Sequence, residues 1–184
     1  MARPKNDKFK NKIAQVAARQ LAERGYNATS HTTIAEECCI SRNLVQYHWP
    51  KKELLAVRYM EDMLSQCVAD LGFADEDLVD DYDRMTAVGT RFISTLLETE
   101  GTRLFLKDII ASRDLTEAVL TFNLNWGVSR VSATDFDFDA VQRTFVSSMG
   151  GFYELLYWSL KHNRTIDVEA EVARVVNAFR SSIG

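Results

Sequence analysis

Apolar residues recur at helical spacing along almost the whole chain, and no stretch shows the alternation typical of a β-strand. The spacing predicts nine helices, three in the first fifty residues and six in the remainder. The first helix ends at Gly25. The next two are short, and Ser30 and Ser41 stand where they can cap their N-termini. Pro50 ends the third helix. The pattern therefore predicts an all-α fold.

The six later helices are longer. Gly101 is expected to interrupt the pattern between the fifth helix and the sixth. A polar segment from Ser132 to Asp139 separates the seventh from the eighth. The apolar stripes of these helices run over 57–71, 85–96, 104–109, 115–126, 141–159 and 168–183.

Composition limits the class of protein. The 184 residues are 46% hydrophobic and 26% charged, as in ordinary globular proteins, and the chain is long enough to bury a core. No apolar stretch is long enough to span a membrane, and the N-terminus lacks the apolar run of a signal peptide. We therefore expect a cytoplasmic protein with no membrane partner.

Charge is unevenly distributed along the chain. Residues 1–60 carry eleven Lys and Arg against five Asp and Glu. The remaining residues carry eleven Lys and Arg against 21 Asp and Glu. A basic N-terminal third on an acidic body indicates that this third binds a polyanion.

Two short helices after a longer one form a helix-turn-helix module, whose last helix enters the major groove of DNA. The stretch from Ile13 to Leu55 resembles the DNA-binding domain of the TetR family of transcriptional repressors. Five features carry this resemblance: Ala-Glu-Arg-Gly-Tyr ending the first helix, Ala-Thr-Ser before the second, Ile-Ala-Glu within it, Ser41 opening the third, and His-Trp-Pro-Lys-Lys-Glu after it. The resemblance implies a nine-helix TetR-like architecture. It places a helix-turn-helix DNA-binding domain at 1–50 and a helical ligand-binding and dimerisation domain at 51–184.

Three residues depart from the family's pattern. Cys39 stands where the family usually has Gly, and a left-handed backbone there would cost ~1 kcal/mol or more. Leu44 replaces a small or hydroxylated residue, and Gln46 stands where Tyr is common. These departures predict an unusual operator.

The third helix carries the expected base contacts. Arg42 can hydrogen-bond guanine, Asn43 or Gln46 can hydrogen-bond adenine, and Leu44 can pack on a thymine methyl group. The alternative is that this face of the helix is exposed to solvent and contacts no base. In the family, positions at the C-terminal end of this helix and just beyond it often contact phosphates. His48 stands there, and a structural hydrogen bond is an equally good interpretation of this residue. The predicted DNA contacts are His31, Thr32, Arg42, Asn43, Leu44, Gln46, Tyr47, His48 and Lys52.

The C-terminal body is rich in aromatic residues, most of which must pack the core. The resemblance implies a ligand cavity among them, with candidates Phe92, Phe105, Phe122, Trp126, Phe145, Met149 and Tyr153. Glycines and serines cluster near residue 150, which suits either a dimer interface or a tight crossing within one chain. The predicted interface residues are Ser147, Ser148, Gly151, Val172, Val175 and Phe179.

The function expected from these features is that of a homodimeric DNA-binding transcriptional regulator. The expected partners are a double-stranded operator and an unidentified small molecule, apolar or aromatic, that releases a repressor from DNA. A redox-responsive regulator using Cys38, Cys39 and Cys67 is the alternative. We expect no enzyme, because the histidines are far apart and no nucleophile or metal motif is present. We also expect no cofactor and no metal site.

Overall fold

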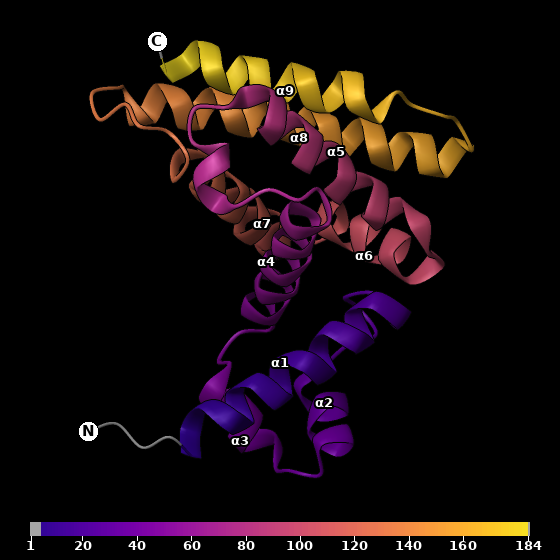
Figure 1. Ribbon diagram of the computed structural model, residues 1–184. Coiled ribbons are helices and arrows are strands. Elements are labelled where there is room, and N and C mark those ends of the chain that lie inside the picture. Colours follow the sequence, from indigo (N-terminus) through magenta and orange to yellow (C-terminus); the bar gives the residue numbers. More distant parts are fainter. Residues whose placement is uncertain (1–4, 184) are drawn as a thin grey trace. The chain divides into compact units, whose positions relative to one another are not determined.

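The computed structural model describes residues 5–183, with side chains from Lys8 onward, and these residues form helices without any strand (Figure 1). Over the same residues, no helix is long and apolar enough to cross a bilayer. The elements are α1 (Lys5–Arg24), α2 (His31–Cys38), α3 (Arg42–His48), α4 (Lys52–Asp70), the 3₁₀ turn η1 (Asp75–Leu78), α5 (Tyr82–Glu98), α6 (Glu100–Ala111), α7 (Arg113–Val128), α8 (Phe138–His162) and α9 (Val168–Ile183). The all-α, nine-helix prediction is thereby confirmed.

Two compact units make up the chain. The first unit consists of Met1–Met63 and Leu96–Ala118, and the second consists of Leu64–Thr95 and Val119–Gly184. Contacts within the first unit thus group α6 with the N-terminal helices, although residues 64–95, which lie between them in the sequence, belong to the second unit. The division of the chain after residue 50 stays a prediction.

Helices α1, α2 and α3 pack around a small apolar core in the first unit (Figure 1). Ile13, Ile34 and Val45 contribute one fully buried side chain from each helix. The Ser30 side chain accepts a hydrogen bond from the Thr33 amide at 3.1 Å, and the Thr33 hydroxyl accepts one from the Ser30 amide at 3.0 Å. This reciprocal capping box fixes the start of α2.

Helix α6 packs closely against α1 within the first unit. Gly101 is buried in the first turn of α6, so the predicted helix break at this glycine is wrong. The break comes at Thr99, whose side chain caps α6 by accepting a hydrogen bond from the Thr102 amide at 3.1 Å. Asp108 of α6 accepts hydrogen bonds from the amide and the side chain of Asn27, at 2.9 and 2.6 Å.

Helices α8 and α9 lie side by side in the second unit, as the orange and yellow ribbons of Figure 1 show. Phe145 and Phe179 meet edge to face, with 5.9 Å between ring centroids. Phe152 and Leu156 of α8 are each 1% exposed. The apolar faces of both helices therefore point into the interior of this unit.

Candidate functional site

A left-handed residue forms the turn between α2 and α3. Cys39 has φ 55° and ψ 45°, and its amide donates hydrogen bonds to the carbonyls of Ala35 and Glu36. Ser41 then begins α3, its side chain accepting a hydrogen bond from the Leu44 amide at 3.2 Å. The turn keeps the geometry that glycine favours and carries a cysteine at a cost of ~1 kcal/mol. The two predicted caps, Ser30 and Ser41, are both present.

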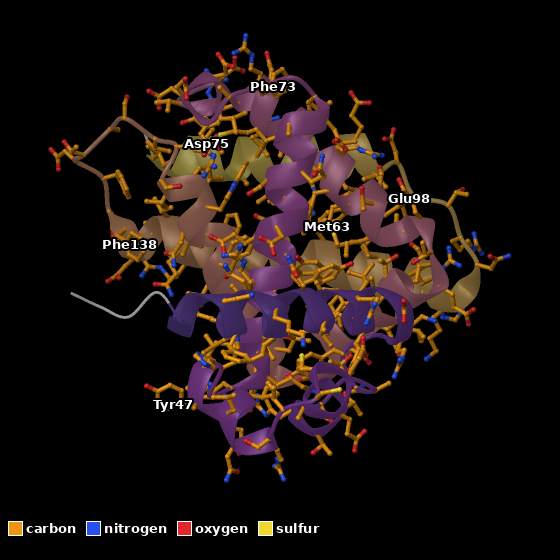
Figure 2. The ribbon with its side chains drawn as sticks, turned by 60° about the horizontal axis from the view of Figure 1, so that its bottom comes forward. Tyr47, Met63, Phe73, Asp75, Glu98 and Phe138 are labelled. Carbon is orange, nitrogen blue, oxygen red and sulfur yellow. The ribbon has the colours of Figure 1, made fainter. Side chains whose placement is uncertain are left out.

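One face of α3 is inward and the other is free. Val45 is fully buried, whereas Arg42 and Asn43, at the N-terminal end, are exposed. Figure 2 shows Tyr47 directed outward from α3, and its side chain is 71% exposed. Leu44 is half-buried rather than fully exposed. The free face thus presents a cation, an amide and a phenol, which are side chains that contact base edges and phosphates.

Three further predicted contacts lie at the start of α2 and at the end of α3. Thr32 is exposed at the start of α2, whereas His31, beside it, and His48, at the end of α3, are half-buried. The Nε2 atoms of both histidines are shielded from solvent and have no hydrogen-bond partner among the described residues. The structural hydrogen bond considered for His48 is therefore not formed through Nε2.

Lys52 is held inside the first unit. Its ammonium donates hydrogen bonds to the carbonyls of Tyr26 and Thr29, at 2.9 and 3.0 Å, and lies 3.6 Å from the centroid of the Tyr26 ring. Burial lowers the pKa of Lys52, with nearby carboxylates opposing the shift. Two of the three N–H groups of the Lys52 ammonium thus close the loop between α1 and α2, and its contact with DNA stays a prediction.

Glu53 completes this cluster. It accepts a hydrogen bond of 2.5 Å from the Tyr26 hydroxyl. Burial favours the neutral carboxyl, but the bond from Tyr26 and the charges of Lys52 and Lys51 outweigh it and lower the pKa of Glu53. Burial raises the pKa of Tyr26, and the hydrogen bond to Glu53 and the negative charge of Glu53 raise it further. The cluster thus fixes the entry into α4 directly after α3.

The second unit contains a partly open apolar cavity of about 80 Å³. Its lining contains no charged side chain, and its polar side chains are Asn123, Trp126 and Tyr153. Five of the seven predicted ligand residues line it: Phe92, Trp126, Phe145, Met149 and Tyr153. Phe105 lies instead in the first unit, with its ring edge to face on Tyr59 at 5.4 Å. Phe122 is half-buried outside the lining.

The predicted interface residues separate into two groups. Val172, Val175 and Phe179 are 5%, 3% and 2% exposed and line the cavity, so a single chain already buries the apolar residues of α9 that the sequence assigns to the dimer interface. Their burial comes from packing of α9 on the interior of its own unit. Ser147 and Gly151 are exposed and Ser148 is half-buried on α8.

The space around Gly150 and Gly151 excludes one of the two interpretations of the glycine and serine cluster on α8. A Cβ atom added to Gly150 or Gly151 would meet nothing within 4 Å. These glycines therefore do not serve a tight crossing between helices of one chain. Their face of α8 remains open.

The cysteines differ in exposure. Cys38 and Cys67 are buried, and Cys39 is exposed. Burial raises the pKa of Cys38, which makes its reactive thiolate rarer. No group of three or more potential metal ligands occurs in the part of the chain that the structure describes. The geometry gives the redox alternative no support beyond the exposed thiol of Cys39.

A buried three-helix core that projects the free face of its last helix is the arrangement of a helix-turn-helix DNA-binding protein. Residues 13–59 match the family model described as bacterial regulatory proteins, tetR family. This chain is therefore a DNA-binding transcriptional regulator whose N-terminal helix-turn-helix domain is of the tetR family. No curated protein matches the chain.

Two functional features escaped the sequence analysis. The internal bonds of Lys52 depend on two carbonyls about 25 residues earlier in the sequence, and no periodicity reports such contacts. Asn123 was detectable in principle. It stands four residues after the buried Val119, and a polar residue on an inward helical stripe indicates a polar group in a cavity.

Proposed function

We propose that this regulator is a homodimeric repressor that leaves its operator when a small apolar or aromatic molecule enters the second unit. The observation that carries the proposal is the apolar cavity within a chain that also has a DNA-binding domain. Ligand sites are concave, mostly apolar and lined by a few polar groups. A ligand that binds one conformation of the dimer more tightly would shift the population toward that conformation.

The open face of α8 supports the dimer. Val146 and Trp158 on this helix are 37% and 48% exposed, and Gly150 and Gly151 leave open space beside Ser147. Exposed apolar side chains beside small residues favour close approach of a second helix. We infer that α8 of a second copy covers this face, and that α9 contributes its outer side rather than the buried Val172–Phe179 stripe.

Base reading is assigned to the N-terminal end of α3. Arg42→Ala should cost about 1–3 kcal/mol of DNA-binding free energy and relax the preference at one base position. Arg113→Ala is the matched control, because it removes an exposed arginine at the start of α7. Fluorescence anisotropy on DNA selected from random fragments by the purified protein gives both affinities. Equal losses on selected and random DNA for Arg42→Ala would contradict base reading by this residue.

Oligomeric state tests the α8 interface. Sedimentation velocity at micromolar concentration should give twice the 20.9 kDa mass of one chain. Gly151→Leu should yield a folded monomer, whereas Ala111→Leu, at an exposed position on α6, should remain a dimer. A monomeric wild-type protein would refute the interface.

Release from DNA tests the regulatory part of the proposal. Acetophenone, a small uncharged aromatic probe, should lower the anisotropy of the protein–DNA complex as it saturates the protein. In vitro transcription from a promoter that overlaps the selected DNA should fall when protein is added and recover with the probe. A bound probe that leaves DNA affinity unchanged would refute release, and a rise in transcription on adding protein would identify an activator.

A further inference from the structure

A single hydrogen-bonded pair interrupts the apolar lining of the cavity. The Asn123 amide nitrogen of α7 donates a hydrogen bond of 3.0 Å to the hydroxyl oxygen of Tyr153 on α8. Tyr153 is 2% exposed, and both residues line the cavity. The phenol therefore has its acceptor function satisfied inside the chain.

The donor function of the same phenol is free. Within the described residues, the Tyr153 O–H proton reaches no acceptor, although a buried hydroxyl normally has one. Burial raises the pKa of Tyr153, with the bond from Asn123 opposing, so the phenol stays protonated at neutral pH. A neutral O–H donor is thus available on a residue that lines the cavity.

The remaining lining limits what this donor can meet. A charged ligand would leave water without a partner of opposite charge, because the cavity has no charged side chain. Phe92, Trp126 and Phe145 supply aromatic walls against which a ring can stack or meet edge to face. These walls favour an uncharged aromatic ligand.

Size restricts the ligand further. The cavity of about 80 Å³ is smaller than the apolar cavity of ~150 Å³ that holds benzene in another protein. One ring is accommodated only if a flexible side chain moves. Met149 is half-buried, lines the cavity and has an unbranched side chain that adapts to different shapes.

We propose that Tyr153 is a specificity-determining residue that donates a hydrogen bond to the acceptor oxygen of an uncharged, single-ring aromatic ligand, with Asn123 orienting its hydroxyl. This inference rests on the proposed function, since it names the chemical class of the effector. The bond is one that an apolar compound of the same shape cannot accept. Such a compound would leave the buried donor unpaired.

Three probes of nearly equal shape test the proposal. Acetophenone carries a carbonyl acceptor, α-methylstyrene replaces that oxygen by a methylene group, and benzoate carries a charge. Titration calorimetry with the full-length protein should give acetophenone an affinity about tenfold above that of α-methylstyrene. Benzoate should bind more weakly than either.

Two variants locate the effect. Tyr153→Phe should weaken acetophenone about tenfold and leave α-methylstyrene unchanged or tighter. Tyr157→Phe is the control, because Tyr157 is a half-buried tyrosine on the same helix outside the cavity lining. Circular dichroism and urea unfolding establish that both variants are folded.

The outcomes separate this inference from the proposed function. Equal binding of acetophenone and α-methylstyrene to wild type and to Tyr153→Phe would overturn the role of Tyr153 and leave a ligand-responsive cavity intact. Preference for benzoate would overturn the uncharged class. Selective, Tyr153-dependent binding that leaves DNA affinity unchanged would support the inference and refute ligand release. Failure of all three probes to bind wild type would refute the inference, while release of DNA by a different compound would still support the proposed function.

Discussion

Replacing Gly101 with alanine should destabilise the first unit, although alanine normally favours helices. A Cβ atom at this position would lie 2.0 Å from the Ala22 carbonyl oxygen and 2.7 Å from the backbone of Glu23. These are main-chain atoms of α1, so no side-chain rotation relieves the overlap. Helix α6 must instead shift away from α1 and disturb the hydrogen bonds between Asn27 and Asp108.

The magnitude follows from two opposing terms. Overpacking against backbone places the steric cost near the upper end of its usual range, about 3 kcal/mol. Within a helix, alanine stabilises the folded state by up to about 1 kcal/mol relative to glycine. The net loss is about 2 kcal/mol, or roughly 4–8 °C in melting temperature for a chain of this size.

Thermal unfolding followed by far-UV circular dichroism measures this loss. Gly150→Ala is the matched control, because within a single chain the added Cβ meets nothing within 4 Å; at protein concentrations low enough to keep the chain monomeric it should raise the melting temperature by about 2–4 °C. An effect of Gly150→Ala that varies with protein concentration would come from subunit contact. The reasoning is refuted if Gly101→Ala melts at or above the wild-type temperature.

Two further substitutions test the turn and the loop around α2. Cys39→Gly should stabilise the protein by about 1 kcal/mol, seen as a higher melting temperature, because the backbone there is left-handed; unchanged or lower stability would contradict the predicted strain. Lys52→Met should lower the free energy of unfolding in urea by about 1–3 kcal/mol, because the Tyr26 and Thr29 carbonyls lose their donor. Unchanged stability together with weaker, less salt-dependent DNA binding would instead favour a phosphate contact.

Local signals in the sequence predicted most of the helices and the exposed face of α3. Ser30 and Ser41 begin α2 and α3 because capping depends on residues within one turn of each other. The inward position of Val45 follows from helical periodicity. The exposed Arg42 lies on the opposite side of the same helix. These features need no knowledge of distant parts of the chain.

Partners that are distant in the sequence account for the features that the sequence did not predict. Gly101 resembles a helix breaker until the α1 backbone that it contacts is known. Val172 and Phe179 form an apolar stripe, and periodicity alone does not say whether the same chain or a second copy buries it. Lys52 resembles a surface cation until the carbonyls of Tyr26 and Thr29 are placed around it.

The discontinuous first unit has a consequence for synthesis of the protein on the ribosome. Residues up to Met63 emerge before Leu96–Ala118, although both stretches belong to that unit. At about 5–20 residues per second, the intervening synthesis takes several seconds. During that interval the α1 backbone beside Ala22 lacks α6, and the first unit is incomplete. A fragment ending at Met63 would never acquire α6, so the α1 backbone that Gly101 contacts would stay exposed to solvent in that fragment.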